Sequence, residues 1–102
     1  MRIPTSFKLI NRTYKIRPMR EDVSNASKAI GHCHYDNADI EVKLDGKQEL
    51  IEHTFYHELT HALLHASTKP KLAKDEKFVD HLAALIHQYE QTKKGELKTA
   101  PQ

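Results

Sequence analysis

The sequence predicts an α+β fold in which a small antiparallel sheet of three to four strands is followed by two packed helices. In the first 45 positions, short runs of β-favouring residues are separated by pairs of turn-forming residues. Residues 49–65 and 76–92 instead carry apolar side chains at helical spacing, and a stretch containing a proline separates them. We expect residues 1–92 to form a single domain and residues 93–102 to be a flexible C-terminal tail.

The composition suits one compact domain with a modest core. The chain has 102 residues, of which 38% are hydrophobic and 29% charged, and its mean hydropathy is −0.70. A net charge of +2 is too small to indicate nucleic-acid binding by itself. One cysteine, Cys33, excludes an internal disulfide framework, and no apolar run is long enough for a signal peptide or a membrane span. We therefore expect a cytoplasmic protein.

The first strands are expected at residues 7–10 and 13–17, with Asn11 and Arg12 as a tight hairpin turn. Pro18 should end the second strand, because proline cannot donate to a strand ladder. Residues 19–30 are ambiguous between a loop and a short helix, and their polar centre favours a loop.

A second hairpin is expected at residues 32–35 and 38–44, with Asp36 and Asn37 as its turn. If Tyr35 pairs with Ala38, the inward face holds Cys33, Tyr35, Ile40, Val42 and Leu44. The opposite face then holds His32, His34, Asp39, Glu41 and Lys43. His32 and His34 could bind a metal on that face, but a solvated surface is the simpler interpretation.

The helix at residues 49–65 contains the motif His57-Glu58-Leu59-Thr60-His61. Side chains four residues apart lie on one face of a helix, so both histidines can bind one metal ion, and Glu58 can reach a water there. His65 is about 12 Å along the axis from His57, too far to share that ion, and is expected at the surface or beside the site. The predicted apolar face comprises Leu50, Ile51, Thr54, Phe55, Leu59, Ala62 and Leu63.

Residues 66–74 are expected to form a loop, and Asp75 is expected to cap a second helix that ends near Thr92. Its predicted buried stripe comprises Phe78, Val79, Leu82, Ala83, Leu85, Ile86 and Tyr89. Packed antiparallel on the first helix, this helix could bring Glu76 to the metal as a third ligand. Asp80 would then accept the outer N–H of a ligating histidine. Taken alone, both acids would be interpreted as solvent-facing residues near a helix N-terminus, and the H-E-x-x-H motif is what favours the ligand interpretation. His81 is the alternative third ligand.

These motifs resemble a known family arrangement. The H-E-L-T-H motif followed by Glu76-Lys77-Phe78-Val79-Asp80 is similar to the gluzincin pattern, H-E-x-x-H then E-x-x-x-D. Residues 54–65, 35–40 and 76–83 more closely resemble small phage and bacterial proteins related to the ImmA/IrrE-type metallopeptidases. The resemblance covers about residues 31–92. It implies a zincin-type site with Zn2+ on His57, His61 and Glu76, with Glu58 as the general base, in a bacterium or a phage-infected host cell.

We therefore expect a zinc-dependent metallopeptidase that acts on a protein or peptide substrate. Residues 38–44 are expected to form the rim of the cleft, where an extended peptide could add as a strand. Candidate oxyanion donors are Tyr56, His81 and His87, which the sequence does not rank. The alternatives are a non-catalytic, zinc-stabilised protein-binding module, or an SprT-like protease acting on DNA-bound protein with His81 as the ligand. No membrane association and no clear nucleic-acid binding are expected, and the oligomeric state is open.

Overall fold

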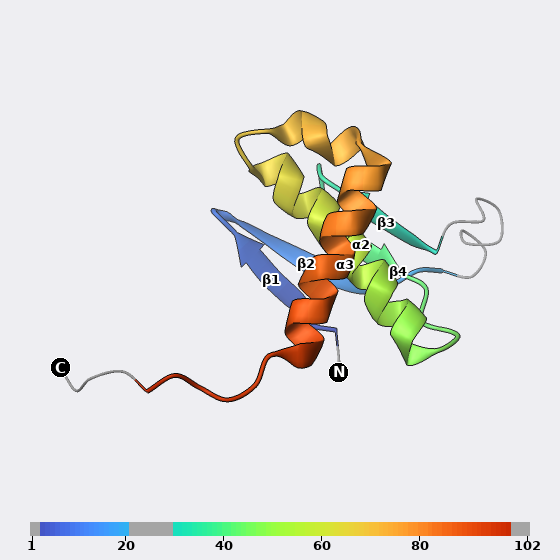
Figure 1. The fold of residues 1–102 in the computed structure, drawn as a ribbon. Helices are drawn as coiled ribbons and strands as arrows, with labels where there is room; N and C mark the ends of the chain where they lie inside the picture. Colours follow the sequence, from blue (N-terminus) through green and yellow to red (C-terminus); the bar gives the residue numbers. More distant parts are fainter. Residues whose placement is uncertain (1–2, 21–29, 99–102) are drawn as a thin grey trace.

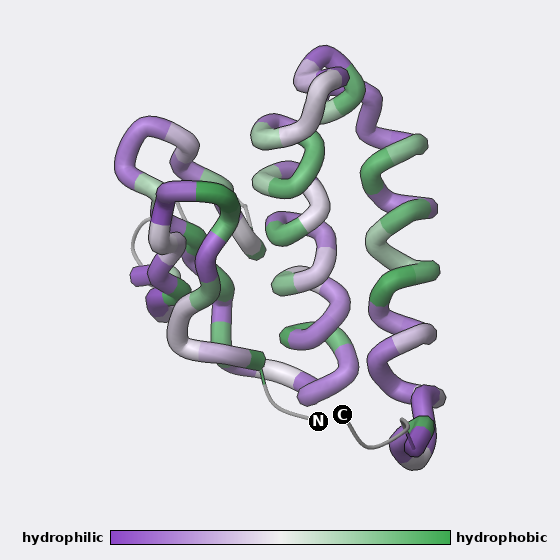
Figure 2. The backbone as a smooth tube through the Cα atoms, turned by 90° about the vertical axis from the view of Figure 1, so that its left-hand side faces the viewer, coloured by the Kyte–Doolittle hydropathy of each residue, from purple (hydrophilic) through white to green (hydrophobic). Residues whose placement is uncertain are grey.

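The computed structural model describes residues 3–20 and 30–98 and shows an α+β fold, as predicted. A four-stranded sheet, helix α2 and helix α3 are stacked in that order, so α2 lies between the sheet and α3 (Figures 1 and 2). The elements along the chain are β1 (Ser6–Leu9), β2 (Arg12–Pro18), β3 (Gly31–His34), β4 (Asp39–Val42), α2 (Gln48–Ala66), the 3-10 helix η1 (Pro70–Lys74) and α3 (Glu76–Thr92).

The sheet is mixed rather than purely antiparallel, which corrects that part of the prediction. Its strand order is β1-β2-β4-β3, and the two hairpins β1–β2 and β3–β4 are antiparallel. The hairpins meet through β2 and β4, which run parallel with Ile16 opposite Ile40. The pairing is parallel because β4, not β3, lies beside β2. As a result β3 is an edge strand, and β4 is paired on both sides.

The first hairpin turn differs from its predicted position, whereas the second hairpin has the predicted register. The first turn falls at Ile10 and Asn11, one residue earlier than predicted, because Leu9 pairs with Arg12. Ile10 has a φ of 55°, a left-handed conformation that is unusual for a β-branched residue. The second hairpin has the predicted register, with Cys33 opposite Ile40. Most of the ambiguous segment, residues 21–29, lies outside the described residues.

The core lies between the sheet and α2, and includes Tyr14, Ile40, Val42, Ile51, Phe55 and Tyr56. Phe7 stacks on Tyr14 and meets Phe55 edge-on, which joins β1 to the helix. Leu44 is 48% exposed rather than inward, because β4 ends at Val42. Asp39 lies on the outer face, as predicted, yet it is buried because Arg17 of the neighbouring strand forms an ion pair with it.

Helix α2 is buried on two sides, whereas the sequence predicted a single buried face. Ile51, Thr54, Phe55 and Ala62 are buried as expected, although Leu50 is exposed. Glu52, Tyr56, Thr60 and Leu64 are buried as well. Tyr56 stacks on His87 of α3, and Leu64 packs in a second cluster with Ala73 and Val79. These residues show that α2 contacts α3 and η1 as well as the sheet.

Helix α3 begins as predicted, since the Asp75 carboxylate accepts a hydrogen bond from the backbone N–H of Phe78 at 3.2 Å. The predicted buried stripe is wrong in part. Val79, Ala83 and His87 are buried, whereas Phe78, Leu85 and Tyr89 are exposed. The helix is turned so that the small residues Val79 and Ala83 face α2, and the larger apolar side chains on the adjoining face are therefore left outside.

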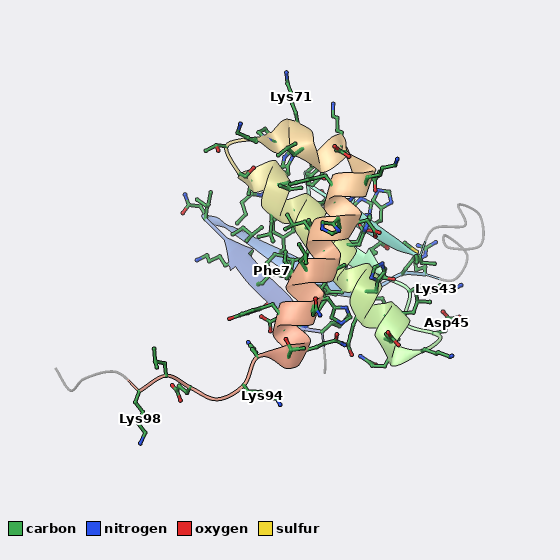
Figure 3. The ribbon with its side chains drawn as sticks, in the orientation of Figure 1. Phe7, Lys43, Asp45, Lys71, Lys94 and Lys98 are labelled. Carbon is green, nitrogen blue, oxygen red and sulfur yellow. The ribbon has the colours of Figure 1, made fainter. Side chains whose placement is uncertain are left out.

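The connection between the helices is partly ordered as η1 rather than a simple loop, and its lysines point outward, as Lys71 does in Figure 3. After Thr92 the described chain continues to residue 98 without regular secondary structure. Within the described ranges, neither helix combines the length and apolar character that crossing a bilayer would require.

Candidate metal centre

Helix α2 places both histidines of the motif on one side, one turn apart. The ring centroids of His57 and His61 are 5.0 Å apart, and both residues are partly exposed. Their side chains point toward the N-terminal end of α3. This arrangement follows from the four-residue spacing on a regular helix.

Helix α3 brings Glu76 to the same point. One Glu76 carboxylate oxygen lies 3.2 Å from Nε2 of His57, and the other lies 3.2 Å from Nε2 of His61. One donor atom from each of the three residues lies within 4.8 Å of the others. No other group of three or more such side chains within the described ranges has donors placed to share an ion. His65 and His81, both exposed, are not part of this cluster.

The three donors suit a small divalent cation. Tetrahedral ligands that hold Zn2+ at about 2.1 Å have donor atoms about 3.4 Å apart. The two histidine–glutamate separations of 3.2 Å, one to each carboxylate oxygen, are close to that spacing, and the three donors taken one per residue lie within 4.8 Å of one another. Two imidazoles and one carboxylate are also a donor set typical of catalytic zinc, with the fourth position left open. The residues present therefore fit a zinc ion.

Contacts behind the histidines fix the orientation of their rings. Oδ1 of Asp80 lies 3.4 Å from Nδ1 of His57, where the sequence placed it, and 3.5 Å from Nε2 of His53. His61 makes a hydrogen bond to the backbone of Ala73 in η1. Outer contacts of this kind select the tautomer of a ligating histidine. Burial lowers the pKa of His61, although Glu76 opposes this effect, and a neutral imidazole is the form that binds metal.

Glu58 is buried beside the cluster and is 9% exposed. Burial raises the pKa of its carboxyl group to about 7; His57 opposes that shift and Glu76 adds to it. Gly31 of β3 packs directly on this side chain. A Cβ at position 31 would lie 3.1 Å from a Glu58 carboxylate oxygen and 2.6 Å from Cγ2 of Thr54. The absence of a side chain at Gly31 thus allows β3 to lie close to the motif.

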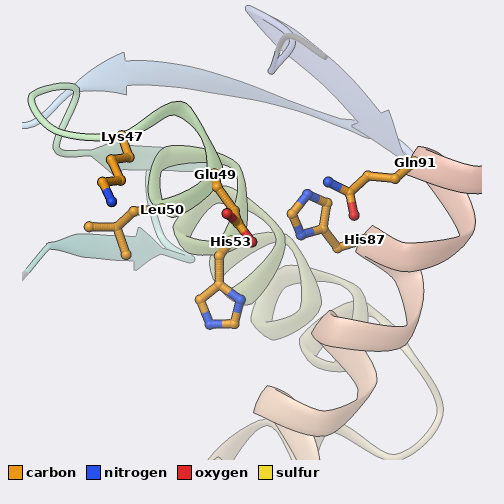
Figure 4. Close-up of a pocket in the computed structure, with 6 residues that line it drawn as sticks. All are labelled: Lys47, Glu49, Leu50, His53, His87 and Gln91. Carbon is orange, nitrogen blue, oxygen red and sulfur yellow. The ribbon is translucent and has the colours of Figure 1, made fainter.

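A cleft of about 310 Å³ opens over the cluster. Its walls are formed by α2, α3 and β3, through Gly31, His32, Cys33, Tyr35, His57, Glu58, His61 and Glu76. A separate hollow of about 380 Å³ lies between the beginning of α2 and the end of α3 (Figure 4). His87 lines that hollow, but none of the three candidate ligands does. The candidate reaction centre is therefore the cleft beside β3.

Two further expectations about this site need correction. Residues 38–44 cannot accept a peptide strand, because β4 is paired with β2 on one side and β3 on the other; the rim strand is β3. None of the predicted oxyanion donors lines the cleft. Tyr56 is buried against His87, His87 pairs with Glu52 at 3.1 Å, and His81 is exposed on α3.

Tyr35 does line the cleft, although no catalytic role was predicted for it. The predicted hairpin register had already placed this residue on the inward face, beside Cys33. The sequence does not show the direction of the turn after β3, and this direction brings the Tyr35 ring to α2. There it stacks on His65.

A protein-family model matches most of this chain. The model of the DUF4344 family, which is described as "Putative metallopeptidase", matches residues 11–102. Neither the curated proteins nor the solved structures yielded a significant match.

Proposed function

Because this chain belongs to the DUF4344 family of metallopeptidases, we propose that it is a zinc-dependent peptidase that hydrolyses peptide bonds in a protein or peptide substrate. His57, His61 and Glu76 would hold the ion, and Glu58 would be the general base. The observation that carries the proposal is the convergence of three ligand atoms within 4.8 Å beside a buried carboxyl group.

A zinc ion held there would supply Lewis acidity, which polarises a carbonyl and makes water a better nucleophile at neutral pH. Glu58 accepts a proton from the attacking water as the new carbon–oxygen bond forms. It then delivers that proton to the departing nitrogen as the carbon–nitrogen bond breaks. The raised pKa of Glu58, about 7 in the metal-free protein, suits a group that must accept and return a proton. Asp80 keeps the His57 ring in position throughout.

The substrate backbone is proposed to pair with β3 (Gly31–His34). This strand has β4 on one side and, among the described strands, no neighbour on the other. An extended peptide on the open side would lie along the cleft wall that contains Gly31 and Cys33. Backbone pairing of this kind does not depend on the substrate's side chains.

Replacing Glu58 with glutamine tests the proposal. The turnover of unfolded casein should fall about 10²- to 10⁴-fold in the variant, which is the contribution expected of a general base. Bound zinc, measured by elemental analysis after dialysis, should stay at one per chain. Glu49→Gln, which removes an exposed acid from the same helix, is the matched control and should behave as wild type.

Loss of zinc together with activity in Glu58→Gln would mean that Glu58 is a ligand rather than the base. A wild-type protein that binds one zinc and cleaves neither casein nor other unfolded proteins would instead support a non-catalytic, zinc-stabilised binding module.

A further inference from the structure

We propose that Tyr35 is a catalytic residue of this site, whose hydroxyl group donates a hydrogen bond to the oxyanion formed during peptide hydrolysis, and that His65 is its positioning residue. The inference rests on the proposed function and adds two residues to it. It also replaces the three oxyanion donors suggested by the sequence, none of which reaches the cleft.

Tyr35 follows edge strand β3 directly and lines the cleft. The candidate ligands and Glu58 line the same cleft. A peptide paired with β3 would run past this position and would bring a carbonyl into the cleft that Tyr35 and Glu58 both line. An oxyanion that forms in this cleft needs a hydrogen-bond donor within reach, and Tyr35 is a cleft-lining residue with a hydroxyl group.

The ring of Tyr35 is held in place by the helix that carries the motif. It stacks on His65 with ring centroids 3.9 Å apart and an interplanar angle of 10°. His65 is one turn beyond His61, so the same helix positions two candidate ligands and the tyrosine ring. The backbone is anchored as well, since the Tyr35 carbonyl accepts a hydrogen bond from the Ala38 N–H at 3.3 Å. A donor fixed before the reaction needs no reorganisation when charge develops.

The Tyr35 hydroxyl is available as a donor. Within residues 3–20 and 30–98, no hydrogen-bond partner to it is found. Burial raises the pKa of Tyr35 to about 12, and the nearby Cys33 and Glu58 add to the shift, so the phenol keeps its proton at neutral pH. A neutral phenol can donate to a negatively charged oxygen without itself being consumed. No covalent bond to Tyr35 forms or breaks in this role.

The other cleft residues on the β3 side are weaker candidates. A cysteine S–H, as in Cys33, is a poor donor. The His32 ring stacks on His34 at a centroid separation of 4.2 Å, and His34 in turn contacts Glu41 at 2.6 Å. Glu41 lies opposite His32 on β4. The two stacked histidine rings are therefore held beside Glu41, on the outer face of the sheet. Tyr35 is the donor that the fold places toward α2.

The test compares zinc-loaded Tyr35→Phe with wild type and with Tyr89→Phe, which removes the hydroxyl of an exposed tyrosine on α3. We expect kcat on fluorescein-labelled, unfolded casein to fall 10²- to 10³-fold in Tyr35→Phe, with KM within about twofold, as for loss of one oxyanion donor. Bound zinc and Tm should match wild type. N-phosphoryl-Leu-Trp, which has a tetrahedral anionic centre, should bind Tyr35→Phe at least tenfold more weakly. Tyr89→Phe should match wild type in all four measurements.

His65 is tested through its ring. His65→Ala should lower kcat about tenfold without loss of zinc, and His65→Phe, which retains a flat ring, should restore most of it. Adding His65→Ala to Tyr35→Phe should cause no further loss, because the histidine acts through the tyrosine hydroxyl. Independent, multiplicative losses in the double variant would refute the positioning role.

Different results would refute the role of Tyr35 and the proposed peptidase activity. If wild type hydrolyses casein and Tyr35→Phe retains its kcat and its affinity for N-phosphoryl-Leu-Trp, the role of Tyr35 is refuted and the peptidase stands. If zinc-loaded wild type neither hydrolyses casein nor binds N-phosphoryl-Leu-Trp, the proposed function is refuted, and the role of Tyr35 with it.

Discussion

Replacing Glu58 with glutamine should stabilise the metal-free protein at alkaline pH, because the proposed base is held in an environment that penalises its charge. The carboxyl group is 9% exposed, and burial raises its pKa from 4.5 to about 7. As the pH rises, the unfolded chain releases this proton first and the folded chain retains it. Stability is therefore present at low pH and is lost between about pH 4.5 and pH 7.

The pKa difference sets the size of the effect. At 1.36 kcal/mol per pKa unit, deprotonation of Glu58 costs the folded state at most about 3 kcal/mol. Glutamine at position 58 has no such charge. The free energy of unfolding, measured by urea denaturation in EDTA at pH 5 and pH 8, should therefore fall by about 2–3 kcal/mol more in wild type than in Glu58→Gln.

Measuring both proteins at two pH values separates the effect of the Glu58 charge on stability from the effect of side-chain packing. Any packing difference between wild type and Glu58→Gln contributes equally at pH 5 and pH 8. Zinc should reduce the difference, because a nearby cation favours the carboxylate. An equal change with pH in wild type and Glu58→Gln would refute the burial argument and remove its support for Glu58 as a base with a raised pKa.

Three other substitutions probe how the fold supports the site. Gly31→Ala should lose about 1–3 kcal/mol by overpacking, because the new Cβ lies 2.6 Å from Cγ2 of Thr54; adding Thr54→Ser removes that methyl group and should recover part of the loss in a urea titration. Ile10→Gly should raise Tm slightly, because relief of a φ of 55° (about 1–2 kcal/mol) exceeds the entropic cost of glycine (about 0.5–1), and a lowered Tm would contradict this. Burial raises the pKa of Glu52, but hydrogen bonds from His87 and Gln48 outweigh it and the net pKa is lowered. Glu52→Gln should therefore cost about 1–3 kcal/mol at pH 7, and a cost that does not shrink below about pH 4.5 would contradict the pairing.

The elements closest to the motif were predictable because they depend on local rules. The four-residue spacing placed His57 and His61 together, and Asp75 correctly marked the start of the second helix. The turn at Asp36 and Asn37 gave the right register for the second hairpin. Each of these features depends on residues within one turn of helix or one hairpin, where backbone geometry leaves few alternatives.

The features that were missed depend on how the elements pack. Apolar residues cover a wide arc of α3, so periodicity alone could not show that Val79 and Ala83, rather than Leu85 and Tyr89, would face α2. The parallel β2–β4 pairing depends on which hairpin strand lies inside the sheet, which alternation does not specify. Tyr35 was missed for the same reason, since its place beside His65 follows from the approach of β3 to α2.

The most direct test of the account is to locate the metal by anomalous diffraction at the zinc absorption edge, in crystals of the wild-type protein grown with one equivalent of zinc. The account predicts a single strong peak about 2.0–2.2 Å from Nε2 of His57, Nε2 of His61 and a Glu76 carboxylate oxygen. A peak whose third protein ligand is His81, or a peak on the outer sheet face at His32 and His34 with none at His57, would contradict it.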